Sequence, residues 1–335
     1  MNGSRQVGRS GLRISPIGLG TASFGREVQA DQARRLAAAY LDAGGNHIDT
    51  ADSYAGGAAE QVVAAVLQGR REEVVISGKV GLPLRPGQDR NRGARRHIRR
   101  AVEGSLGRLR TDRIDILHLH RWDGQTDLEE TLQTLDDLVR WGMVDHVAVS
   151  NWAGWQVAWA AALAQRRGWT PPVAVQGRYS LAERDVEREI LPYCRWAGLG
   201  FIAYSPLCGG LLTGKYVDPL RPPAGTRAAH PELGTSLRRR MSERNLALVD
   251  SLRSEAVAGV SPATLAISWL LRRRGVSGVV VGVTSPEQLA DAMAAPDADI
   301  DPAVFARLTE ACRLDRGYPQ DLLTELDCDG DEARE

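Results

Sequence analysis

Four side chains that could together deliver a proton stand where apolar runs of the chain end. Residues 47–54 begin as an apolar run and become polar within two residues, which is typical of a buried parallel strand that emerges into an active-site loop. This loop carries Asp49 and Tyr54. The next apolar run ends at Lys79, and the one after it ends at His120. A carboxylate, a phenol, an amine and an imidazole therefore follow three successive predicted strands.

Tyr54 and Lys79 suggest how such a site would work. A phenol has a reference pKa near ~10, so it is a weak acid at neutral pH. A nearby ammonium group favours the phenolate and lowers that pKa, which makes Tyr54 a candidate proton donor. A purely structural interpretation is also open, with Asp49 and Lys79 as a buried ion pair and Tyr54 as a half-buried loop aromatic.

His118 and His120 lie two residues apart and therefore share one face of their strand. We expect His118 to be packed inside the fold and His120, nearer the strand end, to be functional. The same pair has the spacing of two metal ligands on a barrel strand, so a metal-dependent hydrolase is an alternative. That alternative leaves Lys79 and Tyr54 without a role, and we expect no metal site.

A regular alternation of apolar runs and helical patterns positions these residues. The predicted strands cover 17–20, 46–49, 74–79, 114–120, 144–149, 173–176, 200–204 and 278–282. The predicted helices cover 29–41, 60–67, 95–109, 128–141, 155–166, 186–196, 237–255, 261–273 and 286–293. A short hairpin with a glycine turn is expected at 5–15. Eight strand–helix units, spaced at roughly thirty residues, favour a closed (β/α)8 TIM barrel over a doubly wound open sheet.

One barrel accounts for nearly the whole chain, so we expect a single domain over residues 1–335. Residues 205–236 form a Gly-, Pro- and Arg-rich loop that is typical of a lid. Residues 315–335 form a polar, acidic C-terminal tail. No third glycine follows Gly18-Leu-Gly20 at the offset that a Rossmann dinucleotide turn requires.

Composition excludes several classes of partner. Lys+Arg and Asp+Glu both number 42, so nothing in the charge calls for nucleic acid or an anionic membrane. The four cysteines lack metal-ligand spacing and are expected to be reduced thiols. The N-terminus has no apolar signal core, and no uninterrupted apolar stretch is long enough to span a bilayer. We therefore expect a cytoplasmic protein; the sequence leaves its oligomeric state open.

Polar residues recur at the strand ends, where barrel enzymes carry their chemistry. The residues at these positions are Gly20-Thr21, Asp49 with Tyr54, Lys79, His120, Ser150-Asn151, Gln176, Tyr204-Ser205 and Gly282. Polar loop residues placed at random would rarely be so regular.

Seven motifs, in this order, resemble the aldo-keto reductase family of (β/α)8 oxidoreductases, which use a nicotinamide cofactor. They are Gly18-Leu-Gly-Thr21, Ile48-Asp-Thr-Ala-Asp-Ser-Tyr54 with Glu60, Ile76-Ser-Gly-Lys79, Arg113-Ile-Asp-Ile-Leu-His-Leu-His-Arg-Trp122, Val149-Ser-Asn151, Ala203-Tyr-Ser-Pro-Leu207 with Leu211-Leu-Thr-Gly-Lys-Tyr216, and Gly282-Val-Thr-Ser-Pro-Glu-Gln288. The resemblance covers residues 5–313. It is nearest to the branch that includes bacterial ketoreductases and potassium-channel beta subunits.

The resemblance implies a catalytic tetrad of Asp49, Tyr54, Lys79 and His120. Tyr54 would donate a proton to the carbonyl oxygen, Lys79 would lower its pKa, and Asp49 would hold Lys79 in place. His120 would orient the carbonyl and stabilise the developing oxyanion. Cofactor (NADPH) contacts are implied for Gly20, Thr21, Asp49, Ser150, Asn151, Gln176, Tyr204, Ser205, Leu207, Gly209, Lys215, Gly282, Thr284, Gln288 and Asp291. Substrate contacts are expected from Tyr54, His120, Trp122 and Trp152.

Departures from the family pattern bear on the cofactor and the substrate. Ala292 stands where many members carry Asn near the adenine, and Gln288 stands where some carry Arg for the 2′-phosphate. The implied substrate is a small-molecule carbonyl compound, an aldehyde or ketone, with a nucleotide-linked keto-deoxysugar of secondary metabolism and a quinone among the candidates. A non-catalytic NADPH-sensing subunit is the second alternative, although an intact tetrad argues against it.

Overall fold

The eight predicted strands close into a parallel barrel. In the computed structural model, which describes residues 3–82, 92–216, 221–256, 260–315 and 317–322, the barrel order is β10-β3-β4-β5-β6-β7-β8-β9. The strands are β3 (Ile17–Gly20), β4 (His47–Asp49), β5 (Val75–Val80), β6 (Ile114–Leu119), β7 (Val144–Ser150), β8 (Ala174–Arg178), β9 (Gly200–Tyr204) and β10 (Val276–Gly282). The (β/α)8 prediction is confirmed, and every strand begins within two residues of its predicted start.

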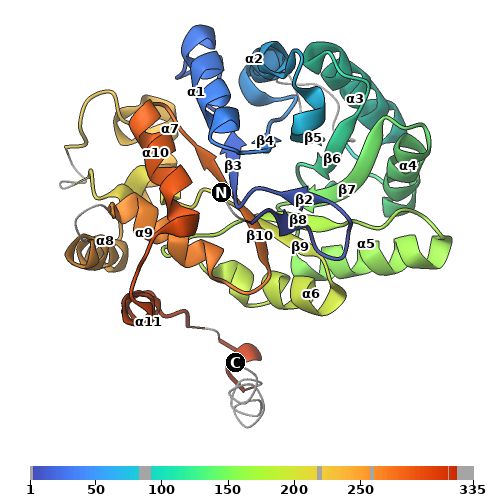
Figure 1. Ribbon diagram of the computed structural model, residues 1–335. Helices are drawn as coiled ribbons and strands as arrows, with labels where there is room; N and C mark the ends of the chain where they lie inside the picture. The colour runs from blue at the N-terminus through green and yellow to red at the C-terminus, as the bar shows by residue number, and fades with distance from the viewer. Residues whose placement is uncertain (1–2, 83–91, 217–220, 257–259, 316, 323–335) are drawn as a thin grey trace.

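Helices surround the barrel (Figure 1). They are α1 (Ala30–Asp42), α2 (Ala58–Leu67), α3 (Arg95–Leu109), α4 (Leu128–Arg140), α5 (Gly154–Arg167), α6 (Ile190–Ala197), α7 (Pro231–Arg238), α8 (Glu243–Glu255), α9 (Pro262–Leu271), α10 (Pro286–Ala294) and α11 (Pro302–Ala311). In α3, Ile98, Val102 and Leu109 are buried, as the helical spacing predicts. None of the helices in the described ranges has the length and apolar character needed to cross a membrane.

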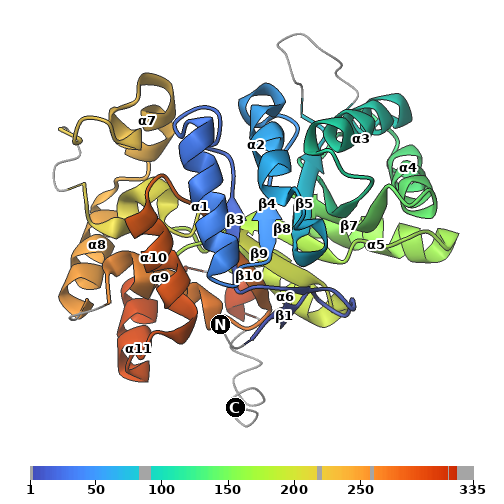
Figure 2. The same cartoon turned by 45° about the horizontal axis from the view of Figure 1, so that its top comes forward.

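A short hairpin closes the N-terminal end of the barrel. It consists of β1 (Arg5–Gln6) and β2 (Arg13–Ile14), which pair antiparallel as predicted. Val7 and Ile14 are fully buried and join a cluster of inward-facing strand residues that includes Ile116 and Ile202. Figure 2 shows β1 at the end of the barrel opposite α7. Only the carboxyl ends of the strands are therefore left open for chemistry.

The C-terminal third differs from the prediction in three places. The predicted helix 237–255 is wrong: α7 ends at Arg238, and α8 begins after Ser242, whose side chain caps it by accepting from the Asn245 N–H at 3.3 Å. Helix α6 starts later than predicted because a 3-10 turn (Asp185–Glu187) precedes it. Helix α11 was not predicted, although its cap, Asp301 followed by Pro302, is a helix-start signal.

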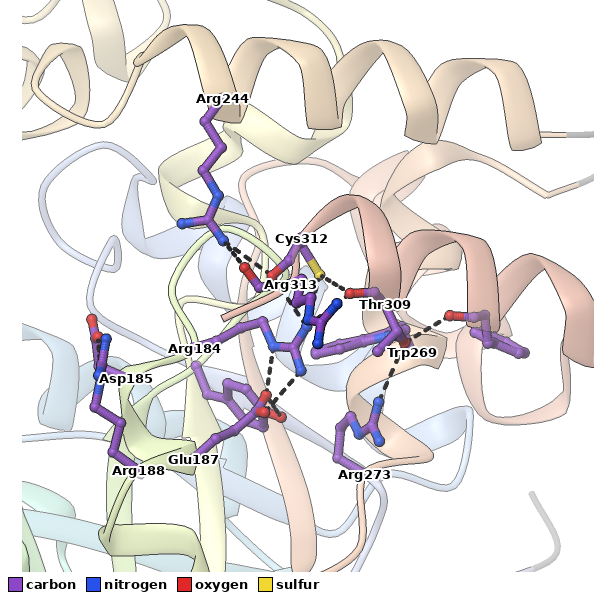
Figure 3. A network of polar contacts seen from close by, with 12 residues as sticks. Arg184, Asp185, Glu187, Arg188, Arg244, Trp269, Arg273, Thr309, Cys312 and Arg313 are labelled. Carbon is purple, nitrogen blue, oxygen red and sulfur yellow. Dashed lines mark hydrogen bonds and ion pairs between the residues drawn. The ribbon is translucent and has the colours of Figure 1, made fainter. Parts of the chain in front are cut away.

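A network of arginines anchors the end of α11 (Figure 3). Arg184, on the loop after β8, donates to the carbonyl oxygens of Thr309 and Cys312 at 3.0 and 3.1 Å. Arg244 of α8 donates to the carbonyl of Cys312 at 3.1 Å. The Trp269 indole N–H donates to the Thr309 hydroxyl at 2.9 Å. Cations at a helix C-terminus satisfy its open carbonyls, so tertiary contacts support a helix whose own sequence pattern is weak.

Candidate active site

Asp49 and Lys79 form a buried ion pair at the carboxyl ends of β4 and β5. The Lys79 Nζ donates to Asp49 Oδ1 at 2.5 Å and to the carbonyl oxygen of Thr50 at 3.2 Å. The other carboxylate oxygen of Asp49 accepts from Gln176 Nε2 at 2.7 Å. Thr21 donates through its hydroxyl to the Asp49 carbonyl at 2.9 Å. Residues from four strand ends thus meet at Asp49, with Lys79 and Gln176 on its carboxylate and Thr21 on its backbone carbonyl.

Charge and burial act against each other in this pair. Burial disfavours the carboxylate, but the charge and hydrogen bond of Lys79 hold the pKa of Asp49 below its usual value. Burial likewise disfavours the ammonium, but Asp49 and Tyr54 raise the pKa of Lys79 above its usual value. The pair is therefore ionised at neutral pH, which places a fixed positive charge beside Tyr54.

Tyr54 faces Lys79 and His120 in the barrel mouth. The Lys79 Nζ lies 5.2 Å from the centroid of the Tyr54 ring, and the Tyr54 and His120 rings meet edge to face with centroids 5.9 Å apart. Burial is the largest influence on the Tyr54 pKa and raises it, while Lys79 acts in the expected lowering direction. The net direction is upward, so Tyr54 is a neutral phenol that carries its proton at pH 7.

His120 is neutral as well. Burial and the nearby Lys79 charge lower the pKa of His120 to about 3. Its Nδ1 is buried without a hydrogen-bond partner, so the other ring nitrogen is the one available to a bound molecule. A neutral imidazole next to a phenol can act as a hydrogen-bond donor to a carbonyl oxygen, in the way that the sequence suggests.

Asn151, directly after β7, links this strand end to the ends of β6 and β9. Its Nδ2 donates to the His120 carbonyl and to the Ser150 hydroxyl, both at 3.0 Å. The Tyr204 hydroxyl donates to Asn151 Oδ1 at 2.6 Å. Asn151 adopts a left-handed φ of 59°, an uncommon conformation outside glycine that marks this turn as constrained.

The segment after β9 folds into a compact turn rather than a bare loop. Residues Cys208–Thr213 form a 3-10 turn in which Gly209 and Gly210 have φ values of 71° and 94°. A Cβ at Gly210 would lie 3.0 Å from the Nζ of Lys215. The predicted loop 205–236 therefore holds a second 3-10 turn and most of α7, and residues 217–220 lie outside the described residues.

The residues implied for the adenosine end of the cofactor lie at the start of α10. Gln288 Oε1 accepts from the Thr284 backbone N–H at 2.9 Å. The Asp291 carbonyl accepts from the Thr264 hydroxyl at 3.0 Å.

Gly282 of β10 pairs with Gly20 of β3, and a Cβ at Gly20 would lie 2.9 Å from Val280. Glycine at position 20 thus permits close packing at this edge of the barrel mouth.

Three indoles gather beside the tetrad. Trp122 meets Trp152 edge to face with centroids 4.6 Å apart and lies 5.8 Å from Trp155. Trp152 is only 3% exposed, so it supports Trp122 from behind, whereas Trp155 is 62% exposed. A cavity of about 220 Å³ opens on the other side of Trp152, next to Asn151 and Gln176.

Sequence reasoning missed two groups of charged residues near the site. Arg227 faces Lys215 and, with burial, lowers its pKa, so a second cation stands at the Gly209-Gly210 turn. Its position in a Gly/Pro/Arg-rich stretch was the available signal. The second group is Asp52 with Glu60 and Arg108, behind Tyr54: the quoted motif contains Asp52 and Glu60, but sequence reasoning assigned them no role and did not link them to Arg108.

His118 is fully buried, as expected, and neither ring nitrogen has a hydrogen-bond partner. Burial, reinforced by Lys79, lowers the pKa of His118 to about 3. In the described part of the chain, no three His, Cys, Asp or Glu side chains are arranged to hold a metal ion. The described residues therefore offer no set of metal ligands for the hydrolase alternative.

The fold and this arrangement define a (β/α)8-barrel enzyme with a phenol, an imidazole and a buried ion pair at its open end. The chain belongs to the aldo/keto reductase family, whose family model matches residues 16–313. It is accordingly an NAD(P)H-dependent oxidoreductase.

Two relatives show the range of this family. The chain is 36% identical over 315 residues to "Uncharacterized oxidoreductase YrpG" of Bacillus subtilis (strain 168), covering 91% of this chain and 94% of that protein. It is 35% identical over 299 residues to "Probable voltage-gated potassium channel subunit beta" of Oryza sativa subsp. japonica, covering 88% of this chain and 90% of that protein. The branch suggested by the motifs is confirmed.

Proposed function

We propose that this protein reduces an aldehyde or ketone to an alcohol with NADPH, using Tyr54 as the proton donor. The observation that carries the proposal is the placement of Lys79. It is 2% exposed, paired with Asp49, and 5.2 Å from the ring of a protonated Tyr54 at the open end of the barrel. A purely structural ion pair does not need a phenol and a neutral imidazole beside it.

The residues present fit a nicotinamide cofactor. Ser150, Asn151 and Gln176 offer hydroxyl and amide groups for a carboxamide, and the ring of Tyr204 can stack on a nicotinamide. After Leu207, Gly209 and Gly210 have left-handed backbone conformations close to Lys215. A turn of this kind next to a lysine suits the binding of a pyrophosphate. The remaining implied contacts are Gly20, Thr21, Ser205, Gly209, Gly282, Thr284, Gln288 and Asp291.

When bound, the cofactor supplies a hydride to the carbonyl carbon. Tyr54 gives its proton to the carbonyl oxygen as negative charge grows there, and the charge of Lys79 favours the phenolate that is left. Asp49 keeps the ammonium of Lys79 in place. His120 donates a hydrogen bond to the same oxygen and stabilises the developing charge.

The substrate lies against Trp122, with Trp152 holding that indole in position. The half-buried Trp122 and the exposed Trp155 can cover a ring that extends from the carbonyl. A nucleotide-linked keto-deoxysugar fits such a site and belongs in a substrate panel with a reactive aldehyde, a ketone and a quinone. We expect residues 205–216 and 221–236 to cover the pyrophosphate.

Calorimetry with chelator-treated protein tests the proposal. We expect NADPH to bind at about one per chain without added metal. We then expect single-turnover oxidation of the bound NADPH when an aldehyde is mixed in. Absence of NADPH binding, with hydrolytic activity restored by a divalent metal, would refute the reductase proposal. Binding without turnover of any carbonyl compound would favour the sensing subunit.

A further inference from the structure

A second buried charge cluster lies directly behind the turn that carries Tyr54. Asp52 and Glu60 are both fully buried. Glu60 Oε2 accepts from Arg108 Nε of α3 at 2.6 Å, while Glu60 Oε1 and both carboxyl oxygens of Asp52 have no hydrogen-bond partner. The backbone N–H of Asp52 donates to the Lys79 carbonyl at 3.1 Å. The cluster therefore joins the Tyr54 loop to β5, α2 and α3.

The turn between these two carboxyl groups is strained. Ala55, Gly56 and Gly57 follow Tyr54 with φ values of 48°, 63° and 96°, so three successive residues are left-handed and one of them is not glycine. Gly57 packs on Arg108, since a Cβ there would lie 2.7 Å from the Arg108 Cδ. Such a turn persists only where its surroundings hold it, and the surroundings here are Arg108 and the two carboxyl groups.

The charges of this cluster do not balance if every group is ionised. Asp52 and Glu60 share one guanidinium, because Lys79, the next cation, is already paired with Asp49. Two buried carboxylates with one cation leave an uncompensated negative charge, which a shared proton removes. We propose that Asp52 and Glu60 share one proton beside Arg108. The two residues act as positioning residues: they hold the strained turn in place, so that Tyr54 meets the carbonyl oxygen.

The groups that face Asp52 agree with this assignment. Burial and then Glu60 raise the pKa of Asp52 to about 7, while the charges of Arg108 and Lys79 act in the lowering direction. We assign the proton to the cluster as a whole, because Glu60 Oε1 and both carboxyl oxygens of Asp52 are buried without a hydrogen-bond partner. Above neutral pH the proton leaves, two carboxylates face each other, and the turn that holds Tyr54 loosens.

The proposal rests on the proposed reductase function for its kinetic readout. The measurement is the single-turnover rate constant of NADPH oxidation with a reactive aldehyde, from pH 6 to pH 8.5. We expect the wild-type rate constant to fall by about tenfold across this range, because the acid is displaced. The Asp52→Asn and Glu60→Gln variants have no shared proton to lose. Their single-turnover rate constants should therefore change by less than about twofold over the same pH range.

Asp115→Asn is the matched control. Asp115 is also a buried carboxylate paired with an arginine, Arg71 at 2.8 Å, but it lies at the N-terminal end of β6, away from the barrel mouth. This variant should keep the wild-type pH profile. Identical profiles for wild type, Asp52→Asn and Glu60→Gln would overturn the clamp.

Infrared difference spectroscopy tests the shared proton without any reaction. We expect a protonated-carboxyl stretch at pH 6 that disappears as the pH rises to 8.5, and that is absent from both Asp52→Asn and Glu60→Gln. A wild-type spectrum without such a band refutes the shared proton even if the enzyme is active. Conversely, the band with no turnover of any carbonyl compound refutes the reductase function and leaves the shared proton standing.

Discussion

Lys79 shows how a costly buried charge becomes useful at the scale of single residues. Removing an ammonium group from water is unfavourable, but the Asp49 carboxylate at 2.5 Å and the nearby Tyr54 more than offset that cost and keep the pKa of Lys79 above its usual value. Gln176 satisfies the second oxygen of Asp49 and so keeps the ion pair from rotating away from Tyr54. The result is a cation held by two hydrogen bonds of its own, to Asp49 and to the Thr50 carbonyl, beside the phenol that we propose as the proton donor.

Tyr54→Phe removes one oxygen and keeps the ring that packs against His120. We expect turnover to fall by about 10²–10⁴-fold, because a positioned general acid contributes that much. NADPH affinity should change little, since the phenol is assigned to the carbonyl oxygen. Single-turnover oxidation of bound NADPH is the measurement. A variant that retains most of the wild-type rate would show that Tyr54 is not the acid.

Lys79→Met should lower turnover as well, because Tyr54 loses the charge that favours its phenolate. The combined Tyr54→Phe and Lys79→Met variant should be no slower than the worse single variant, since both changes disable one proton-delivery unit. Leaving Asp49 unpaired destabilises the fold by about 3–5 kcal/mol, so urea unfolding must be measured alongside the rates. Additive losses in the double variant would mean that the two residues act separately.

At the scale of elements, we propose that the turn after β9 holds the cofactor phosphates. Gly210 stands at φ 94°, and a side chain there would meet Lys215. Left-handed backbone is open to glycine and costs other residues about 1–2 kcal/mol. In the proposed cofactor site, this one short segment would bring Lys215 to the pyrophosphate.

Gly210→Ala should displace Lys215 and weaken NADPH binding by about tenfold or more, since a charged hydrogen bond contributes about 1.5–3 kcal/mol. The dissociation constant from calorimetry measures this. Gly107→Ala is the control: it lies in α3 with open space around a new Cβ, so it should leave NADPH binding unchanged and stabilise the helix by up to about 1 kcal/mol. Equal NADPH affinity in both variants would remove Lys215 from the phosphate site.

At the scale of the whole molecule, the barrel encloses three imidazoles. Burial lowers the pKa of His118 and of His120 to about 3 and that of His47 to about 4, all below the value near 6.5 in an unfolded chain. The unfolded state therefore binds more protons as the pH falls below 6.5. The stability that these neutral imidazoles contribute is present above pH 6.5 and is lost as the pH falls toward 3–4.

We expect the free energy of unfolding to drop steeply between pH 6.5 and pH 4, with His118 alone contributing about 3 kcal/mol of that drop. In urea unfolding at several pH values, His118→Gln should flatten the dependence. His146→Gln, at a half-buried position of β7, should leave the slope unchanged. A slope unaffected by His118→Gln would mean that this imidazole is solvated or paired in solution.

The sequence by itself determined the barrel and its reactive end. Apolar runs alternating with helical patterns require a parallel sheet, and eight of them close, so the strand ends that carry Asp49, Lys79 and His120 had to meet. The spacing of apolar residues reveals the strands and helices because each of these elements is formed by a few residues that are consecutive in the chain. Helix α11 escaped prediction because its stability comes from Arg184 and Arg244, far away in the chain.

Only the tertiary structure decided the electrostatics. The sequence suggested that Lys79 would lower the Tyr54 pKa, and only packing showed that burial outweighs it. Likewise, Asp52 and Glu60 share Arg108 across three elements, which no spacing in the chain announces. The physical reason is that the pKa of a buried group depends on every charge around it, and those charges come from strands and helices that become neighbours only when the barrel closes.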